Sequence, residues 1–266
     1  MRSQPLVVFG ITGRMGQALI RALREGARFH LFGAIASPQS SRLGMDAATE
    51  GQATGVTITG DSAAVLLPGS VALDFSLGSA VAAHAGACSE AGVPLLVGTT
   101  GFDAATLAAL ERAASKIAIL LAPNTSIGVA VLRKLVEQAA LALGAAYDIE
   151  IIEAHHSAKR DAPSGTALSL GEAAAAARGM ALEDLAIYDR HAVQTPRRPG
   201  SIGFSSVRAA DIVGEHTVMF AAEGERLELT HRATDRIAFA RGALRAAAWL
   251  SLQPKGLYHM RDVVGL

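Results

Sequence analysis

The chain has 266 residues, of which half are hydrophobic and 18% are charged, a composition typical of a folded globular protein rather than a disordered one. Lysine plus arginine and aspartate plus glutamate number 24 each, so there is no basic excess to favour nucleic acid and no acidic excess to favour a basic partner. A chain of this length forms one large domain or two moderate ones.

The first 125 residues alternate short apolar runs with amphipathic stretches. Strands are predicted at 6–9, 31–35, 56–59, 71–75, 95–97 and 117–121, and helices at 15–23, 79–91 and 103–115. This alternation predicts an α/β fold with a doubly wound parallel sheet of Rossmann type. Ligands bind such sheets outside the carboxyl ends of the strands, where this chain has "GITG" (10–13), "GTTG" (98–101) and "APN" (122–124).

The pattern changes after residue 125. Helices are predicted at 129–143, 164–178 and 236–250, and strands at 148–153, 201–208, 216–222 and 226–231, with a hairpin at Gly224. We therefore expect an α+β domain at 127–235 with a mixed, largely antiparallel sheet. The last helix should pack back on the first domain, so residues 1–126 and 236–266 are expected to form a dinucleotide-binding domain.

The single cysteine and the start of the chain bear on location. Cys88 cannot form an internal disulfide and is interpreted as a buried apolar side chain. The first ten residues have no secretory signal pattern, and no apolar run is long enough to span a membrane. We expect a cytoplasmic protein with no membrane or nucleic-acid partner.

A glycine turn joins the first strand to the first helix. Gly10 permits a tight turn, Gly13 allows close approach of a phosphate, and Gly16 lets the helix pack on the strand. The helix start adds N–H groups and a positive dipole end, so the turn suits the pyrophosphate of a dinucleotide. The spacing is GxxGxxG rather than GxGxxG, and the alternative is a glycine-rich junction that binds no ligand.

The residue that follows the second strand bears on the choice of nicotinamide cofactor. An acidic residue often binds the ribose hydroxyls there, but this chain has Ser37. Nothing at that position repels a 2′-phosphate, and Ser40, Ser41, Arg42 and Arg14 are available to bind one. The cofactor is expected to be NADPH or NADH, with NADPH favoured; alternatively, Arg14 and Arg42 are only solvated.

The stretch "EAHHSAKRDAPSGTA" (153–167) carries the second group of candidate residues. His155 and His156 point different ways, and histidine exchanges a proton near neutral pH while Lys159 supplies a positive charge. "APSGTA" (162–167) opens a helix whose free N–H groups suit a carboxylate. The alternatives are a structural histidine pair, an ordinary helix cap, or a zinc site, which the lack of cysteine and of a third ligand disfavours. No metal is expected.

Together these motifs resemble the dihydrodipicolinate reductase family of the diaminopimelate route to lysine. The resemblance spans nearly the whole chain. It rests on "GRMG" (13–16), "GTTGF" (98–102), residues 153–167, "IGFSSVRAADIVGEHTVMF" (202–220) and "GLYHMRDVV" (256–264).

The resemblance implies roles for individual residues. His155 would be the catalytic acid/base and Lys159 a proton donor or a carboxylate ligand. The substrate, a small dicarboxylate, would be bound by His156, Ser164, Gly165 and Thr166. The family is usually a homotetramer built through sheets of the second domain, so the resemblance makes residues 127–235 the expected substrate-binding and oligomerisation domain. The cofactor would be contacted by Gly10, Ile11, Thr12, Gly13, Arg14, Met15, Ser37, Gly98, Thr99, Thr100, Ala122, Pro123, Asn124 and Thr125.

The implied reaction adds hydride to C4 of an unsaturated cyclic dicarboxylate and a proton to C3. Catalysis of the preceding loss of the 4-hydroxyl stays open. Two departures from the family pattern concern the cofactor: Ser37-Pro38 replaces an acidic–basic pair, and Thr125 replaces an aromatic residue.

Three other classes were compared. A short-chain dehydrogenase needs Tyr-x-x-x-Lys, which none of the three tyrosines provides. An NAD(P)-sensing protein would keep the glycine turn but has no need of the His-His…Lys group. A related reductase acting on another small dicarboxylate is the nearest alternative.

Overall fold

The computed structural model describes residues 3–191 and 194–265. The chain divides into two compact units. Unit 1 comprises residues 1–127 and 236–265, and unit 2 comprises residues 128–235. No helix in the described ranges is long and apolar enough to cross a membrane.

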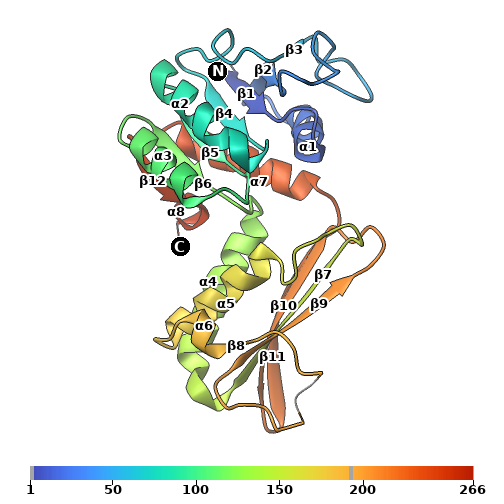
Figure 1. Cartoon of the computed structure of the whole chain (residues 1–266), viewed down its shortest axis with the longest axis vertical. Coiled ribbons are helices and arrows are strands. Elements are labelled where there is room, and N and C mark those ends of the chain that lie inside the picture. Colours follow the sequence, from blue (N-terminus) through green and yellow to red (C-terminus); the bar gives the residue numbers. More distant parts are fainter. Residues whose placement is uncertain (1–2, 192–193, 266) are drawn as a thin grey trace. The chain divides into compact units, whose positions relative to one another are not determined.

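Unit 1 is built on a parallel sheet of seven strands among the described residues, in the order β12-β6-β5-β4-β1-β2-β3 (Figure 1). The central strands are short runs of fully buried residues, as expected when helices cover both faces. The strands are β1 (Gln4–Phe9), β2 (Phe29–Ile35), β3 (Ile58–Thr59), β4 (Val71–Asp74), β5 (Leu95–Val97), β6 (Ala118–Leu121) and β12 (Gly256–His259).

Helices pack on the two faces of this sheet (Figure 1). On one face, Val7 and Phe9 form a core with Val81, Cys88 and Leu110 from α2 and α3. On the other, α7 packs on α1 and on β4, β5 and β6. The expected doubly wound fold is therefore confirmed, with Cys88 buried. The helices are α1 (Arg14–Leu23), η1 (Gly78–Ala80), α2 (Val81–Ala91), α3 (Ala104–Ala114), α7 (Ile237–Leu250) and α8 (Met260–Val264).

Unit 2 contains a mixed sheet of five strands among the described residues, in the order β11-β10-β7-β9-β8. The sheet is antiparallel at β11–β10 and β10–β7 and parallel at β7–β9 and β9–β8. A two-residue turn with Gly224 at φ +84° joins β10 to β11, as the hairpin signal predicts. The strands are β7 (Asp148–His155), β8 (Ala186–Ile187), β9 (Ile202–Arg208), β10 (Gly214–Ala222) and β11 (Glu225–Ala233).

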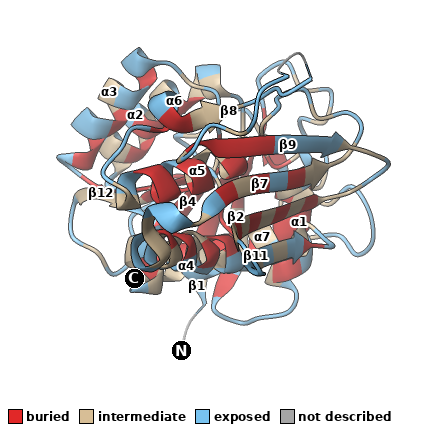
Figure 2. Ribbon diagram, turned by 90° about the horizontal axis from the view of Figure 1, so that it is seen from below, coloured by how far each residue is buried: buried red, intermediate tan, exposed pale blue. Residues whose placement is uncertain are grey.

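One face of this sheet is covered by helices. Ile149, Ile151, Val218 and Phe220 form a core with α4 and α5. Figure 2 shows β7 alternating between buried and more exposed residues, β9 changing from buried to exposed along its length, and β11 exposed over most of its length. The helices are α4 (Ile127–Leu143), η2 (Gly144–Ala146), α5 (Gly165–Ala177) and α6 (Leu182–Leu185).

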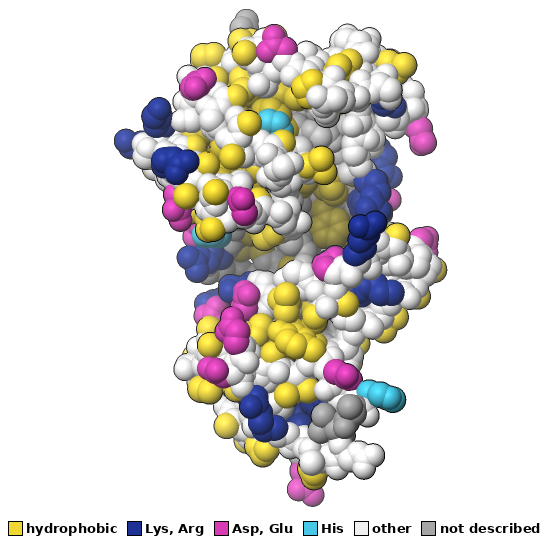
Figure 3. All heavy atoms as spheres, viewed as in Figure 1, with side chains coloured by type: hydrophobic (Ala, Val, Ile, Leu, Met, Phe, Trp, Pro, Cys, Tyr) yellow, Lys and Arg dark blue, Asp and Glu magenta, His cyan; other side chains and the backbone are white. Residues whose placement is uncertain are grey.

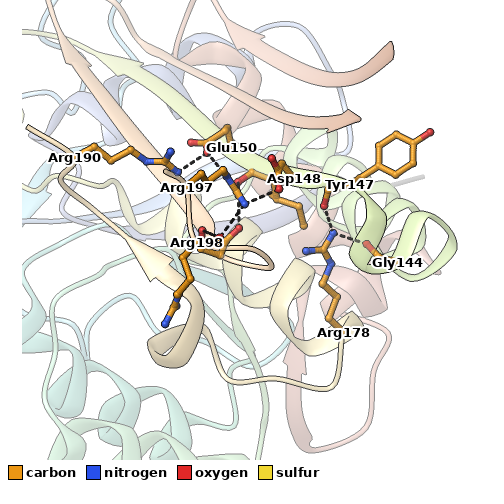
Figure 4. Close-up of polar contacts among 10 residues, drawn as sticks. Gly144, Tyr147, Asp148, Glu150, Arg178, Arg190, Arg197 and Arg198 are labelled. Atoms are coloured by element: carbon orange, nitrogen blue, oxygen red, sulfur yellow. Dashed lines mark hydrogen bonds and ion pairs between the residues drawn. The ribbon is translucent and has the colours of Figure 1, made fainter. Parts of the chain in front are cut away.

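The loop before β9 is fastened to β7 by Arg197 (Figure 4). Its guanidinium pairs with Asp148 at 2.7 Å and with Glu150 at 3.1 Å, and it donates to the carbonyl oxygens of Ile149 and Ser201. Arg190 pairs with the same Glu150 oxygen at 2.8 Å. The stretch 194–201 has no helix or strand before Ile202 and is held in place by side-chain hydrogen bonds.

Candidate active site

The glycine turn between β1 and α1 has the shape that a dinucleotide requires. Gly10 has φ +76°, and a Cβ there would lie 2.4 Å from the carbonyl oxygen of Phe75. A Cβ on Gly16 would lie 2.3 Å from the oxygen of Ile11, so both glycines are needed for packing. Gly13 is the exposed N-cap of α1, and no side chain in the described ranges caps the helix there. The N–H groups of the first turn are thus open to an anion, which fits a pyrophosphate.

The other expected cofactor segments lie at the same edge of the sheet. Gly98 N–H donates to Asp74 O at 2.9 Å, and Ala122 N–H donates to Val97 O at 2.9 Å. Hydrogen bonds therefore join the segments that follow β5 and β6 to the ends of the neighbouring strands β4 and β5. A Cβ on Gly98 would lie 2.1 Å from the ring of Phe75, so this glycine makes room for an aromatic ring behind the turn. The structure therefore brings the segments 10–15, 98–100 and 122–125 to one side of unit 1.

A buried carboxylate that sequence reasoning missed supports these segments. Asp74, at the end of β4, is fully buried and lies 2.8 Å from Nδ1 of His84. It also accepts hydrogen bonds from Ser76 Oγ at 2.6 Å and Thr99 Oγ1 at 3.0 Å. Burial raises the pKa of Asp74, but the hydrogen bonds from His84 and Ser76 outweigh it and the net pKa is lowered. The ionised Asp74 thus fixes Thr99 in the expected nicotinamide loop.

Thr125 and Ser37 have different environments. Thr125 is buried, and its hydroxyl donates to Phe239 O on α7 at 2.8 Å, so this side chain fastens the loop after β6 to the last long helix. Ser37 is exposed directly after β2, with its hydroxyl 2.6 Å from the side-chain oxygen of Gln39. No carboxylate occupies that position. Arg14 is exposed on the first turn of α1.

Arg42, expected to be available for a phosphate, is instead part of the loop between β2 and β3. It donates to the carbonyl oxygens of Asp46 and Ala48, both at 3.2 Å. Its Nε is buried and has no hydrogen-bond partner among the described residues. Gln17 on α1 ties the same loop to the glycine turn by donating to Ile11 O at 2.8 Å and Ala47 O at 2.9 Å. The loop beside Ser37 is therefore ordered by its own hydrogen bonds.

The residues expected to bind substrate lie where β7 leads to α5. His155 is the last residue of β7, and His156 follows it at the start of the connecting loop. Lys159 Nζ pairs with Asp161 at 2.8 Å, and the Lys159 N–H donates to His156 O at 3.0 Å. The loop thus keeps the histidine pair and the lysine close to one strand end.

Ser164 begins α5 as its N-cap. Its hydroxyl accepts the Ala167 N–H at 3.1 Å and lies 3.0 Å from Nε2 of His216, and the residue is buried. The hydroxyl of Ser164 therefore serves the helix and His216. Gly165 is exposed and Thr166 is half-buried, and both lie in the first turn of α5, where the positive end of the helix dipole favours an anion.

Sequence reasoning also missed Glu153, Arg208 and His216. Glu153 lies 2.5 Å from His155 Nδ1, and Arg208 forms a two-pronged ion pair with it. Burial lowers the pKa of His155, and the carboxylate of Glu153 partly opposes this. Burial lowers the pKa of His216 to about 4. One signal for Glu153 was available: it shares the inward face of its strand with Ile149 and Ile151, where an unpaired carboxylate is rarely tolerated.

The described residues contain no group of three or more His, Cys, Asp or Glu side chains suited to a metal ion. Both signs of charge occur on both units of the face shown in Figure 3. This fits the equal numbers of acidic and basic residues in the sequence.

Comparisons with known proteins cover nearly the whole chain. The family models described as "Dihydrodipicolinate reductase, N-terminus" and "Dihydrodipicolinate reductase, C-terminus" match residues 4–125 and 128–264. A 4-hydroxy-tetrahydrodipicolinate reductase from Thiobacillus denitrificans is 50% identical over 262 residues, covering 98% of both chains. Another, from Anaeromyxobacter dehalogenans, is 48% identical over 263 residues, covering 98% of this chain and 97% of the relative.

The fold is also similar to solved structures. A dipicolinate-bound dihydrodipicolinate reductase from a Paenisporosarcina species has a TM-score of 0.74 and 24% identity, with 98% of each chain covered. A probable dehydrogenase from Thermotoga maritima has a TM-score of 0.60 and 11% identity, covering 97% of this chain and 92% of the other.

Proposed function

This chain belongs to the dihydrodipicolinate reductase family, and from that membership we propose that it reduces 4-hydroxy-tetrahydrodipicolinate to tetrahydrodipicolinate with NADH or NADPH. The product is an intermediate of the diaminopimelate route to lysine. The observation that carries the proposal is the match to both family models, together with 48–50% sequence identity to two 4-hydroxy-tetrahydrodipicolinate reductases over nearly the full length of the chain.

Unit 1 would hold the dinucleotide. The N–H groups after Gly13 would bind the pyrophosphate, because a helix start without a side-chain cap is an anion site. The segments 98–100 and 122–125 would contact the nicotinamide end. Asp74 supports this role by fixing Thr99, whose hydroxyl is 3.0 Å from the carboxylate.

Unit 2 would hold the substrate. The two carboxylates of a cyclic dicarboxylate would meet the first turn of α5 at Gly165 and Thr166 and the charge of Lys159, with His156 beside them. Lys159 is already paired with Asp161 at 2.8 Å, so substrate binding would draw the ammonium away from that exposed carboxylate. His155 would face the ring carbon that takes up a proton.

The proposed reaction has three steps, which are loss of water, addition of hydride and addition of a proton. Loss of water from the 4-hydroxy compound leaves an unsaturated ring. A nicotinamide dinucleotide held at the glycine turn and the segments 98–100 and 122–125 would supply the hydride for C4 of that ring. His155 donates a proton to C3 of the resulting enamine and regains one from solvent, while Lys159 stabilises negative charge on the substrate.

NADPH is proposed as the preferred cofactor. Ser37 is exposed and uncharged where a carboxylate would repel a 2′-phosphate, and Arg14 is exposed on the adjoining helix start. Arg42 contributes less than the sequence alone indicated, because its guanidinium is engaged with loop carbonyls.

The proposal is tested with a coupled assay. Dihydrodipicolinate synthase forms the unstable substrate from pyruvate and aspartate semialdehyde, and oxidation of NADPH and of NADH is followed separately. We expect oxidation that depends on the synthase, is lost in His155→Gln, and is inhibited by pyridine-2,6-dicarboxylate in competition with substrate. Binding of cofactor without any oxidation would instead favour an NAD(P)-sensing protein. Oxidation that another dicarboxylate supports better would favour a different reductase.

We also propose that the protein is a cytoplasmic homotetramer assembled through the sheet of unit 2. Supporting this, Ile152 on β7 and Val207 on β9 are apolar residues exposed on the sheet, with 37% and 46% of their surfaces accessible.

A further inference from the structure

The carboxylate of Glu153 is buried beneath the proposed catalytic histidine. Only 1% of its side chain is exposed, and Oε2 lies 2.5 Å from Nδ1 of His155. The two residues are two apart on β7, and side chains at i and i+2 share one face of a strand. The contact is thus set by the regular backbone of β7 rather than by a loop.

Arg208 fixes this carboxylate in one orientation. It lies opposite His155 in the parallel pairing of β7 with β9. Its Nη1 donates to Oε2 at 2.8 Å and its Nη2 to Oε1 at 2.6 Å, while the Ser164 N–H donates to Oε1 at 3.2 Å. A planar guanidinium that binds both carboxylate oxygens restricts rotation as well as neutralising charge.

The same guanidinium reaches the loop that carries Lys159. Arg208 Nη2 donates to Asp161 O at 2.6 Å, and the Asp161 side chain pairs with Lys159 at 2.8 Å. Arg208 on β9 therefore binds both the carboxylate that contacts His155 and the loop that carries Lys159.

The contact with Glu153 has a defined effect on the imidazole. A carboxylate can only accept, so Nδ1 of His155 must carry a hydrogen, and in the neutral ring the lone pair is then on Nε2. Nε2 lies over Gly214, where a Cβ would be only 3.1 Å away, so the glycine leaves space beside this nitrogen. Nε2 is the ring atom left to exchange a proton with a ligand.

Other charged and titratable groups face the same imidazole. His216 on β10 stacks edge-on with its ring centroid 5.1 Å from that of His155. Lys159 and Arg208 lower the pKa of His155 through their positive charges, in addition to burial, whereas Glu153 raises it. Glu153 itself stays ionised: burial raises its pKa, but the hydrogen bonds from Arg208, Ser206 and His155 outweigh this and hold it at about 2.

We propose that Glu153 and Arg208 are positioning residues that hold His155 in a single tautomer, with Nδ1–H toward Glu153 and Nε2 free to pass a proton to the substrate carbon. The proposal rests on the proposed function only for the identity of that carbon. When the protonated ring gives up its Nε2 proton, the Nδ1–H is retained, and the Glu153 carboxylate stabilises the charged form before transfer.

The tautomer is measured directly, without turnover. Histidine labelled with ¹⁵N in the ring is incorporated, and the His155 signals are identified by their loss in His155→Gln. In the neutral ring we expect Nδ1 to be protonated and Nε2 to be unprotonated. A protonated Nε2 with a bare Nδ1 in the native enzyme would overturn the proposal, whatever substrate the enzyme proves to use.

The kinetic test uses Glu153→Gln, with Glu150→Gln as the matched control. Glu150 is on the same strand and is also paired with arginines, but it does not contact His155. Glu153→Gln should lower kcat by about 10- to 100-fold with KM changed less than about threefold, the loss typical when a histidine loses the partner that orients it. Glu150→Gln should keep kcat.

The pH profile separates positioning from general damage. If His155 acts as an acid, kcat falls as pH rises through the pKa of His155. Because Glu153 raises that pKa, its removal lowers the pKa. The fall in kcat should therefore occur at lower pH in Glu153→Gln than in the native enzyme. Arg208→Lys keeps the positive charge but loses the two-pronged geometry, and should give a smaller loss of kcat than Glu153→Gln. A reduced kcat with an unmoved pH profile and an unchanged tautomer in Glu153→Gln would refute the role.

Discussion

At the scale of single residues, His216 makes unit 2 sensitive to acid. Its side chain is buried against Ser164. Burial is the main cause that lowers the pKa of His216 to about 4, and the positive charge of nearby His155 lowers it further. In the unfolded chain the pKa returns to about 6.5. Between these values the unfolded state binds more protons, so the free energy of unfolding decreases as pH falls from about 6.5 to about 4.

This predicts a loss of up to about 3 kcal/mol over that interval. Glu153 extends the trend, because its pKa of about 2 lies below the ordinary value of 4.5 for a glutamate and its contribution is lost as pH falls from about 4.5 to 2. Urea unfolding at a series of pH values measures the slope. His216→Gln, which can still donate to Ser164, should flatten it between pH 6.5 and 4, and an unchanged slope would contradict the assignment.

A second residue-scale prediction concerns Ser37. Ser37→Asp would place a negative charge beside the 2′-position of the ribose, repelling the 2′-phosphate of NADPH and accepting hydrogen bonds from the hydroxyls of NADH. We expect the ratio of kcat/KM for NADPH to that for NADH to fall by about tenfold or more, equivalent to about 1.4 kcal/mol. Ala53→Asp, at an exposed position of the loop between β2 and β3, serves as a control for charge alone. Equal shifts in both variants would show that Ser37 does not contact the ribose.

At the scale of elements, the segment before β9 depends on Arg197. Its side chain is only 16% exposed and satisfies two carboxylates and several carbonyl oxygens along β7 and the loop. Arg197→Met would leave Asp148 and Glu150 without this partner, and we expect the free energy of unfolding to fall by about 1–3 kcal/mol. Arg226→Met removes an ion pair whose arginine is 65% exposed, and should cost less than about 1 kcal/mol. Equal losses, measured by urea unfolding, would mean that Arg197 is not a structural anchor.

The sequence predicted the helices and strands in which buried apolar residues follow one another or recur at a regular spacing. The central strands of unit 1 are apolar apart from Gln4 at the start of β1 and Asp74 at the end of β4, and α1, α3, α5 and α7 lie within one or two residues of their expected bounds. β12 was missed because Gly256–His259 is a half-buried edge strand without an apolar run. α6 has four residues and β8 has two, which is too few to show a periodic pattern of apolar residues, so neither was predicted.

The candidate site divides in the same way. His155, Lys159 and the start of α5 lie in one continuous motif, so a single stretch of sequence predicted them. Arg208 and His216 reach the site through strand pairing across more than 50 residues, which no local pattern encodes. Thr125 is a similar case: the sequence predicts a cofactor contact for this residue, and the structure adds a hydrogen bond from its hydroxyl to Phe239 O on α7, 114 residues away in the chain.

At the scale of the whole molecule, the proposed tetramer predicts a mass in solution of four times the chain mass of 27.4 kDa. Ile152→Lys would place a charge on the exposed face of the unit 2 sheet and should shift the assembly toward smaller species. Leu141→Lys, on an exposed residue of α4, is the matched control and should leave the mass unchanged. Light scattering coupled to gel filtration reports both. A native mass of one chain would exclude the tetramer.

Unit 1 is discontinuous, since residues 236–265 complete a unit begun by residues 1–127. β12 pairs with β6, and α7 packs its buried residues on the sheet, with Gly242 fitting against the backbone of Thr125. A ribosome makes these segments last. During synthesis unit 1 therefore lacks α7 and β12, and part of one sheet face stays uncovered, at a stage when unit 2 already has its whole sequence. We therefore expect unit 2 to complete its fold before unit 1, and the exposed apolar face of unit 1 to be prone to aggregation until α7 has been made.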